Sequence, residues 1–270
     1  MINSLCKIRH TLKKQHPLVH CITNPISITQ CANAILAVGG RPIMAEHPGE
    51  VQEITQTAGA VMLNLGNITD MRMEAMQISA RTATEHKTPV LLDLVGIACS
   101  RLRRDFSICL LQKTTPAVIK GNYSEINALF HQTYRSSGVD ADASLGVAEL
   151  DQVTVHLARS YSSVVLASGK VDIITDGTRL FHVKNGTSQL SDITGTGCML
   201  GALTAAYLSV EPSINAAVLA CLVMGIGGQL SKTDLGTGSF LTNLMDALST
   251  VSDADLKQYM NMEELCIEEI

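Results

Sequence analysis

Short apolar segments alternate with longer segments of helical periodicity over the first half of the chain. The short segments are rich in Val, Ile and Leu and span 17–23, 41–45, 60–65, 89–95 and 117–122. Helical patterns follow them at 27–38, from Glu50 onward, and at 69–86, 100–113 and 123–133. Strands that are apolar throughout need cover on both faces, and such strands in alternation with helices are typical of repeated βα units. The pattern therefore predicts a mainly parallel sheet with helices on both faces.

The second half continues this pattern and then becomes almost entirely helical. A small, polar stretch at 135–146 predicts a surface connection into a helix over 147–161. Strand-like segments follow at 163–168, 171–175 and 179–183, and the tight-turn pair Asp176-Gly177 predicts an antiparallel hairpin at one edge of the sheet. Beyond Gly195 the periodicity predicts helices at 198–208, 213–231, 239–249 and 253–260.

Composition bounds the class of protein. The whole chain, residues 1–270, is expected to form one domain, because α/β folds commonly reach about 250 residues around one sheet. A net charge of −5 without a run of Lys or Arg argues against nucleic acid as a partner. The uncharged segment 212–231 contains Pro212, Asn215 and Gln229, which favours a buried helix over a membrane span.

Cysteine and histidine spacing narrows the chemistry further. The eight cysteines are scattered without a CxxC pair, as free thiols in a reducing cytosol are, which argues against a thiol redox protein. The N-terminal segment lacks the apolar core and cleavage site of a signal peptide, so a cytoplasmic location is expected. The histidines show no HxH or HExxH spacing, so no transition-metal site is predicted.

The segment DITGTGCML, Asp192 to Leu200, carries the clearest chemical signal. Gly195 and Gly197 bracket Thr196 directly before an apolar helix, and the free N–H groups of a first helical turn hold phosphate well. The same glycines could instead serve tight packing. Cys198 stands in the first turn, where the helix dipole favours a thiolate, although a cysteine there could also be a small core residue.

Seven ordered motifs give the chain a family resemblance. They are VHCITNPIS, RPIMAEHPGEV, LNLGNIT, LLDLVG, VIKGNYSEI, DIITDG and GTGC, and the match as a whole spans residues from about Val19 to Leu248. Together they resemble hydroxyethylthiazole kinase of thiamine salvage. The resemblance implies a ribokinase-like three-layer α/β fold and ATP-dependent phosphorylation of the hydroxyl of 4-methyl-5-(2-hydroxyethyl)thiazole. Related ribokinase-like kinases carry Asp at the position of Cys198.

The resemblance also implies roles for particular residues. The catalytic segment would be Gly195, Thr196, Gly197 and Cys198, with Cys198 accepting the hydroxyl proton or orienting the hydroxyl. Residues implied on the thiazole side are Met44, Gly195, Asn24, Gly66 and Asn67, of which the last three lie near the carboxyl ends of predicted strands, where open α/β sheets bind ligands.

ATP and Mg²⁺ are the implied co-substrate and cofactor. Lys120 stands where the family usually has Arg as an ATP contact, and Ser168 where it usually has Thr; Lys keeps a charge but loses the bidentate fork. Asp93 and Glu125 are the acidic residues expected near Mg²⁺, through water. Leu94 stands where the family usually has a proline after Asp93, so the resemblance does not predict the geometry of the loop that follows Asp93.

Two other functions stay open at this point. One is a related kinase for hydroxymethylpyrimidine or pyridoxal, which Asp at position 198 would have favoured. The other is a catalytically weak nucleotide-binding regulator, suggested by Lys120, Ser168 and Leu94. The resemblance further implies a homotrimer with acceptor sites at the subunit interfaces.

Overall fold

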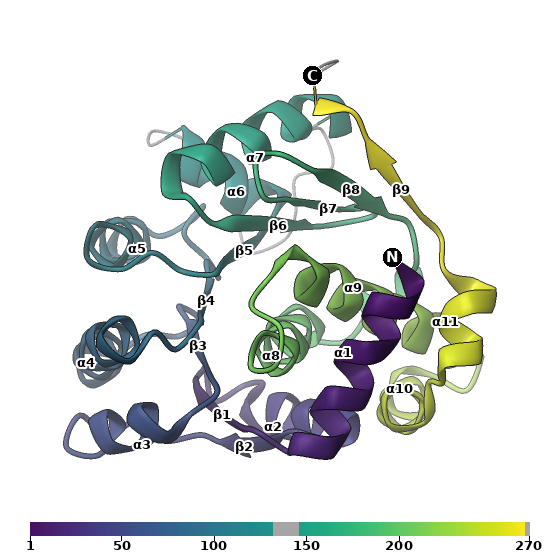
Figure 1. Cartoon of the computed structure of the whole chain (residues 1–270), viewed down its shortest axis with the longest axis horizontal. Coiled ribbons are helices and arrows are strands. Elements are labelled where there is room, and N and C mark those ends of the chain that lie inside the picture. The colour runs from purple at the N-terminus through teal and green to yellow at the C-terminus, as the bar shows by residue number, and fades with distance from the viewer. Residues whose placement is uncertain (132–145, 268–270) are drawn as a thin grey trace.

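A nine-stranded sheet forms the middle layer of the chain in the computed structural model, which describes residues 1–131 and 146–267 (Figure 1). The strand order is β2-β1-β3-β4-β5-β6-β7-β8-β9; neighbours from β2 to β6 are parallel and those from β6 to β9 antiparallel. The strands are β1 (Leu18–Ile22), β2 (Arg41–Ile43), β3 (Ala60–Asn64), β4 (Val90–Asp93), β5 (Val118–Asn122), β6 (Val164–Ser168), β7 (Asp172–Thr175), β8 (Leu180–Val183) and β9 (Met262–Leu265).

Helices cover both faces of this sheet (Figure 1). One face carries α3 (Val51–Thr57), α4 (Asp70–His86), α5 (Arg101–Lys113), α6 (Tyr123–Phe130) and α7 (Val147–Tyr161). The other carries α1 (Ile2–Gln15), α2 (Ile28–Val38), α8 (Thr196–Leu208), α9 (Ile214–Leu230), α10 (Thr237–Thr250) and α11 (Asp253–Tyr259). Successive strand residues point to opposite faces, so Met62 packs toward α8 and α9 while Leu63 packs toward α4. The predicted three-layer α/β fold is confirmed.

Some predicted helices begin one residue before the observed helix, because the predicted range includes the N-cap residue. Thr69 and Ser100 cap α4 and α5 by accepting the N–H of Arg72 and Arg103. The predicted surface connection 135–146 and the end of the predicted helix 123–133 lie largely outside the described residues.

Two elements are present that the sequence pattern did not predict. Helix α1 is polar on average, yet it buries Leu5, Ile8 and Leu12. Strand β9 pairs with β8, so the predicted β7–β8 hairpin is present but is not the outermost part of the sheet.

The long apolar segment near the C-terminus is a buried helix, as predicted. In α9 every residue from Ala216 to Gly228 is buried against α8, α10 and the sheet. Among the described residues, no helix combines the length and apolar character needed to cross a membrane. All eight cysteines are free thiols.

His182 joins three elements at the antiparallel side of the sheet. Its Nε2 lies 2.7 Å from an Asp151 carboxylate oxygen on α7, and its Nδ1 lies 3.4 Å from Glu263 on β9. The hydrogen bond that His182 donates to Asp151 and the nearby negative charges raise the pKa of His182 above its ordinary 6.5, although burial opposes this.

We expect His182→Gln to flatten the pH dependence of stability. A raised histidine pKa stabilises the fold fully below pH 6.5, and this contribution is lost as pH rises through the higher folded-state value. The stability difference between the wild type and His182→Gln should therefore shrink from pH 6 to pH 8 in urea unfolding. His86→Gln, at an exposed position, serves as the control, and equal pH slopes for wild type and His182→Gln would contradict the prediction.

Candidate active site

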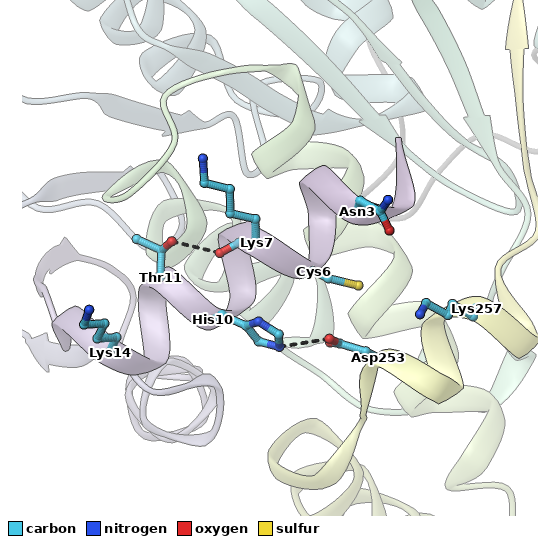
Figure 2. Close-up of a pocket in the computed structure, with 8 residues that line it drawn as sticks. All are labelled: Asn3, Cys6, Lys7, His10, Thr11, Lys14, Asp253 and Lys257. Carbon is cyan, nitrogen blue, oxygen red and sulfur yellow. Dashed lines mark hydrogen bonds and ion pairs between the residues drawn. The ribbon is translucent and has the colours of Figure 1, made fainter.

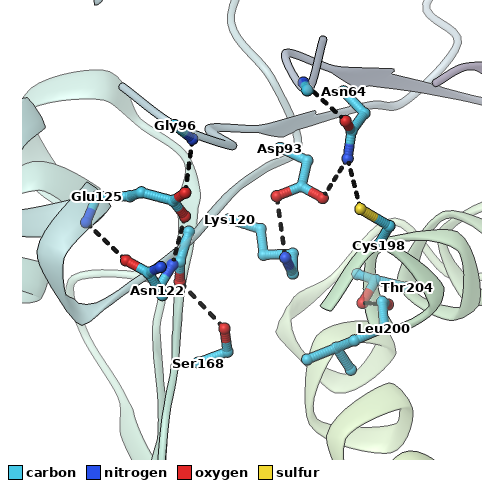
Figure 3. A network of polar contacts seen from close by, with 12 residues as sticks. Asn64, Asp93, Gly96, Lys120, Asn122, Glu125, Ser168, Cys198, Leu200 and Thr204 are labelled. Carbon is cyan, nitrogen blue, oxygen red and sulfur yellow. Dashed lines mark hydrogen bonds and ion pairs between the residues drawn. The ribbon is translucent and has the colours of Figure 1, made fainter. Parts of the chain in front are cut away.

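Polar side chains gather where β1, β3, β4 and β5 end on the same edge of the sheet, beneath the start of α8 (Figure 3). The parallel register places Asn64 beside Asp93, and Asp93 beside Lys120, on three adjacent strands. Each residue interrupts an otherwise apolar strand near its carboxyl end. The fold thus assembles a polar cluster from residues far apart in the sequence.

Lys120 and Asp93 form a buried ion pair at the centre of this cluster. The Lys120 Nζ lies 2.9 Å from Asp93 Oδ1, and the residues are 3% and 0% exposed. Burial would lower the pKa of Lys120, but the Asp93 charge outweighs burial and raises that pKa. Burial raises the pKa of Asp93, opposed by Lys120 and by the Asn64 amide, which donates to Oδ2 at 2.7 Å. We conclude that the two groups are held as charged partners.

Cys198 lies beside this pair in the first turn of α8. The side-chain amides of Asn24 and Asn64 each donate toward its Sγ at 3.4 Å. Burial and the Asp93 charge raise the pKa of the Cys198 thiol, outweighing Lys120. Burial and the Asp93 charge therefore act against the thiolate that the helix N-terminus would favour, and the site favours the thiol form of Cys198.

The two glycines of the GTG segment have different geometric roles. Gly195 is the N-cap of α8 with φ 89°, and a Cβ on it would stand 2.8 Å from Ser27 Cβ. Within the described part of the chain, the only atom that a Cβ on Gly197 would meet is Lys120 Nζ, 3.8 Å away. The backbone at Gly197 therefore leaves open space above the Lys120 ammonium, bordered by the first N–H groups of α8.

A cleft of about 720 Å³ opens next to this space. Ser168 at the end of β6, together with Thr196 and Gly197, lines it, whereas Lys120 lies beneath the GTG segment. Ser168 Oγ donates to the Gly121 carbonyl at 3.4 Å, and Thr196 Oγ1 to the Leu190 carbonyl at 2.9 Å. Apolar side chains contribute another part of the lining: Leu190, Leu200 and Met224.

Glu125 is tied to the backbone at the start of α6. Its carboxylate accepts the N–H of Gly96 at 2.7 Å and that of Asn122 at 2.8 Å, the latter within a capping box. Burial, followed by the Asp93 charge, raises the pKa of Glu125 to about 7. The two acids expected near a metal thus influence one another within one buried network.

The residues expected on the thiazole side fall into two groups. Asn24 contacts Cys198 directly, and Gly66 packs so closely that a Cβ would stand 2.8 Å from Asn24 Nδ2. Met44 is half-buried on the segment after β2, and exposed Asn67 follows Gly66 with φ 48°. Asn24 and Gly66 are therefore at the cluster, and Met44 and Asn67 belong to the loops leading from it.

Two residues of the site were missed by the sequence reasoning. Asn64 links Asn24, Asp93 and Cys198, and an amide closing the apolar strand AVMLN was a signal that could have found it. Ser27 is fully buried under Gly195, and its hydroxyl has no hydrogen-bond partner of normal geometry among the residues that the structure describes. Nothing in the local sequence distinguishes Ser27 from an ordinary N-cap.

A second concavity of about 420 Å³ lies between α1 and α11 (Figure 2). Its lysines, Lys7, Lys14 and Lys257, stand well apart around it and do not converge (Figure 2). Asp253 is paired there with Arg9 and His10. This concavity lacks the convergent polar groups of a binding site, so the cleft beside α8 is the candidate active site.

Comparison with known proteins shows which family the chain belongs to. Residues 9–254 match the model of the hydroxyethylthiazole kinase family. The chain belongs to the hydroxyethylthiazole kinase family. A Clostridium botulinum relative named hydroxyethylthiazole kinase 2 is 46% identical over 252 residues, covering 92% of this chain and 95% of the relative.

Solved structures agree with this assignment. The structure of a hydroxyethylthiazole kinase protein from Pyrococcus horikoshii superposes with a TM-score of 0.90 at 31% identity, covering 97% of this chain and 99% of that one. A ribokinase-like superfamily protein from Enterococcus faecalis has a TM-score of 0.65 at 14% identity over 88% of this chain and 87% of its own. That second likeness shows the fold alone, and the fold is the ribokinase-like one expected for hydroxyethylthiazole kinases.

Proposed function

We propose that this chain transfers the γ-phosphoryl group of ATP to the hydroxyl of 4-methyl-5-(2-hydroxyethyl)thiazole. The observation that carries the proposal is the open space above Lys120 at Gly197, because it lies between the cleft and the Asn24–Cys198 contact. ATP bound in the cleft and an alcohol bound beside Cys198 would bring the γ-phosphoryl group and the hydroxyl together in this space. Membership of the hydroxyethylthiazole kinase family supports the choice of acceptor.

The proposed mechanism relies on position and charge. The alcohol oxygen attacks the γ-phosphorus, and the bond from phosphorus to the ADP oxygen breaks. The first N–H groups of α8 and the buried Lys120 ammonium stabilise the charge on the transferred group. Because burial and the Asp93 charge raise the pKa of the Cys198 thiol, we assign Cys198 the role of orienting the hydroxyl by a hydrogen bond and not that of the base. The hydroxyl proton leaves late, to a phosphate oxygen.

The residues present fit a magnesium ion that arrives with the nucleotide. The described residues contain no group of three His, Cys, Asp or Glu side chains able to hold a metal. Each carboxylate oxygen of Glu125 accepts one backbone N–H, which leaves lone pairs free for water. Asp93 and Glu125 would therefore hold Mg²⁺ through water, while phosphate oxygens supply direct ligands. Bound there, Mg²⁺ would neutralise phosphate charge.

The decisive experiment measures ATP consumption with Mg²⁺, with and without the thiazole alcohol, and detects the thiazole phosphate by mass spectrometry. Hydroxymethylpyrimidine and pyridoxal serve as competing acceptors. Turnover that depends on the thiazole supports the proposal. Thermal stabilisation by ATP without turnover on any acceptor would instead support a nucleotide-binding regulator.

We expect Cys198→Asp to retain at least about a tenth of the activity, because Asn24 and Asn64 already donate to this position and a carboxylate can accept both bonds. Activity of the variant should rise with pH, since burial and Asp93 raise the pKa of the thiol at this position and would act on a carboxyl in the same direction. The measurement is kcat/KM from pH 5 to 9, with Cys99→Asp at an exposed position as control. A folded but inactive variant would count against the orienting role.

The homotrimer and the cytoplasmic location stay predictions. One observation supports the first: Ile26, two residues after Asn24, is 63% exposed, as an apolar side chain covered by a neighbouring subunit would be in the isolated chain.

A further inference from the structure

Two loops carry three of the residues proposed for the acceptor side, Met44 on one and Gly66 and Asn67 on the other, and one side chain contacts both loops. Arg72, the third residue of α4, points its guanidinium toward the segment after β2 and the loop after β3. Its Nε and Nη2 donate to the Glu46 carboxylate at 2.7 and 3.3 Å. Its Nη1 donates to the Asn67 carbonyl at 2.9 Å. All three guanidinium nitrogens therefore connect the loop of Met44 with that of Gly66.

The contact is buried and geometrically constrained. Arg72 is 7% exposed, and its backbone N–H donates to the Thr69 cap at 3.3 Å, which fixes the start of the side chain. The forked contact with Glu46 suits a guanidinium and not an ammonium. Asn67 adopts φ 48°, in the left-handed region, so its carbonyl direction depends on an outside partner.

The segment of Met44 is also held from the opposite side. His20 on β1 is fully buried, with Nε2 2.9 Å from the Ala45 carbonyl and Nδ1 3.0 Å from Thr55 Oγ1. A carbonyl can only accept, so Nε2 carries the hydrogen and Nδ1 accepts from Thr55. Burial lowers the pKa of His20, which keeps the ring neutral. Met44 thus stands next to a carbonyl anchored by His20 and two residues before a carboxylate anchored by Arg72.

We infer that Arg72 is a positioning residue of the acceptor site: it couples the Met44 and Asn67 loops so that both walls keep one spacing. The inference rests on the proposed function for its ligand, the thiazole alcohol. Arg72 touches neither the cleft lining nor the Lys120–Asp93–Cys198 cluster among the contacts of the described residues. Its loss should therefore affect acceptor binding more than phosphoryl transfer.

Steady-state kinetics test the direction of this effect. Arg72→Gln is expected to raise KM for the thiazole alcohol about tenfold while KM for ATP and kcat stay within about twofold, since only acceptor positioning is lost. For Arg72→Lys, KM for the alcohol should lie between the values of the wild type and of Arg72→Gln, because lysine keeps a positive charge opposite Glu46 but lacks the forked guanidinium. Arg101→Gln, on the exposed side of α5, is the matched control. Unchanged KM for the alcohol, or equal changes in all constants, overturns the inference.

Hydrogen exchange tests the coupling without catalysis. In Glu46→Gln, faster exchange is expected at amides 66–68, on the loop that Glu46 itself does not contact, with Glu53→Gln on α3 as control. Faster exchange confined to 44–47, or spread evenly over the chain, overturns the inference. Should Glu46→Gln fail to fold, Arg72→Lys gives the same readout. If the wild type does not phosphorylate the thiazole, the proposed function fails, and the exchange result still decides the coupling.

Discussion

Replacing Lys120 by methionine is expected to remove nearly all activity and to destabilise the fold. Methionine keeps an unbranched chain without the charge, so Asp93 would remain at 0% exposure with its ammonium partner gone. Breaking a buried pair in this way costs about 3–5 kcal/mol. Activity should fall about 10²-fold or more, because the cation beneath the transferred phosphoryl group is lost.

Urea unfolding and steady-state turnover measure the two effects separately. Lys113→Met, on the exposed last turn of α5, is the control. The double variant Lys120→Met with Asp93→Asn removes both charges and should regain much of the stability but none of the activity. If Lys120→Met alone kept wild-type stability, Asp93 would not be held as a charged partner.

Replacing Gly197 by valine is expected to abolish phosphoryl transfer in a folded protein. The new Cβ would meet only Lys120 Nζ, at 3.8 Å, so the fold can accept the side chain. The valine methyl groups would fill the space where the phosphoryl group approaches the helix N-terminus, which should lower kcat/KM about 10³-fold or more. Turnover and the thermal midpoint are the measurements.

The chain supplies a matched control for this substitution. Gly236-Thr237-Gly238 repeats the GTG sequence at the start of α10, where Gly236 has φ 111° and a Cβ on Gly238 would meet nothing within 4 Å. Gly238→Val therefore carries the same helix-propensity cost at the same helical position, away from Lys120. Comparable activity losses in both variants would show that the loss comes from a weakened helix start and not from filling the open space above Lys120.

The repeated GTG also shows what sequence can and cannot predict here. Alternating apolar segments predicted the strands and most helices, because burial on both faces leaves a clear periodicity. Local sequence does not say which Gly-Thr-Gly binds a ligand; that depends on Lys120 lying under Gly197, which the order and register of β4 and β5 determine. The family motifs supplied the choice that periodicity could not.

The misses have a similar cause. Helix α1 is polar on average, and its few apolar residues, Leu5, Ile8 and Leu12, were overlooked although they recur at helical spacing. Strand β9 is short and carries two glutamates, and its position depends on distant partners such as Lys184, which pairs with Glu263. The raised pKa of Cys198 was missed because burial and the Asp93 charge are properties of the assembled site. Arg72 was missed because its partners lie on other loops, 26 residues away in one case.

Every residue of α8 from Cys198 to Leu208 is buried, with α2 and α9 on either side and β3 and β4 beneath. A helix enclosed in this way cannot tilt without repacking a whole layer of the core. The first turn of α8, with the open space at Gly197, should therefore stay in place during a catalytic cycle. The rest of the cleft lining comprises Asn122 at the end of β5, Met224 and Gly225 of α9, and residues in and beside the β6–β7 turn and the segment 184–191, of which the last two are connections. If the cleft closes around the phosphoryl donor, these connections would move toward α8 while α8 stays still.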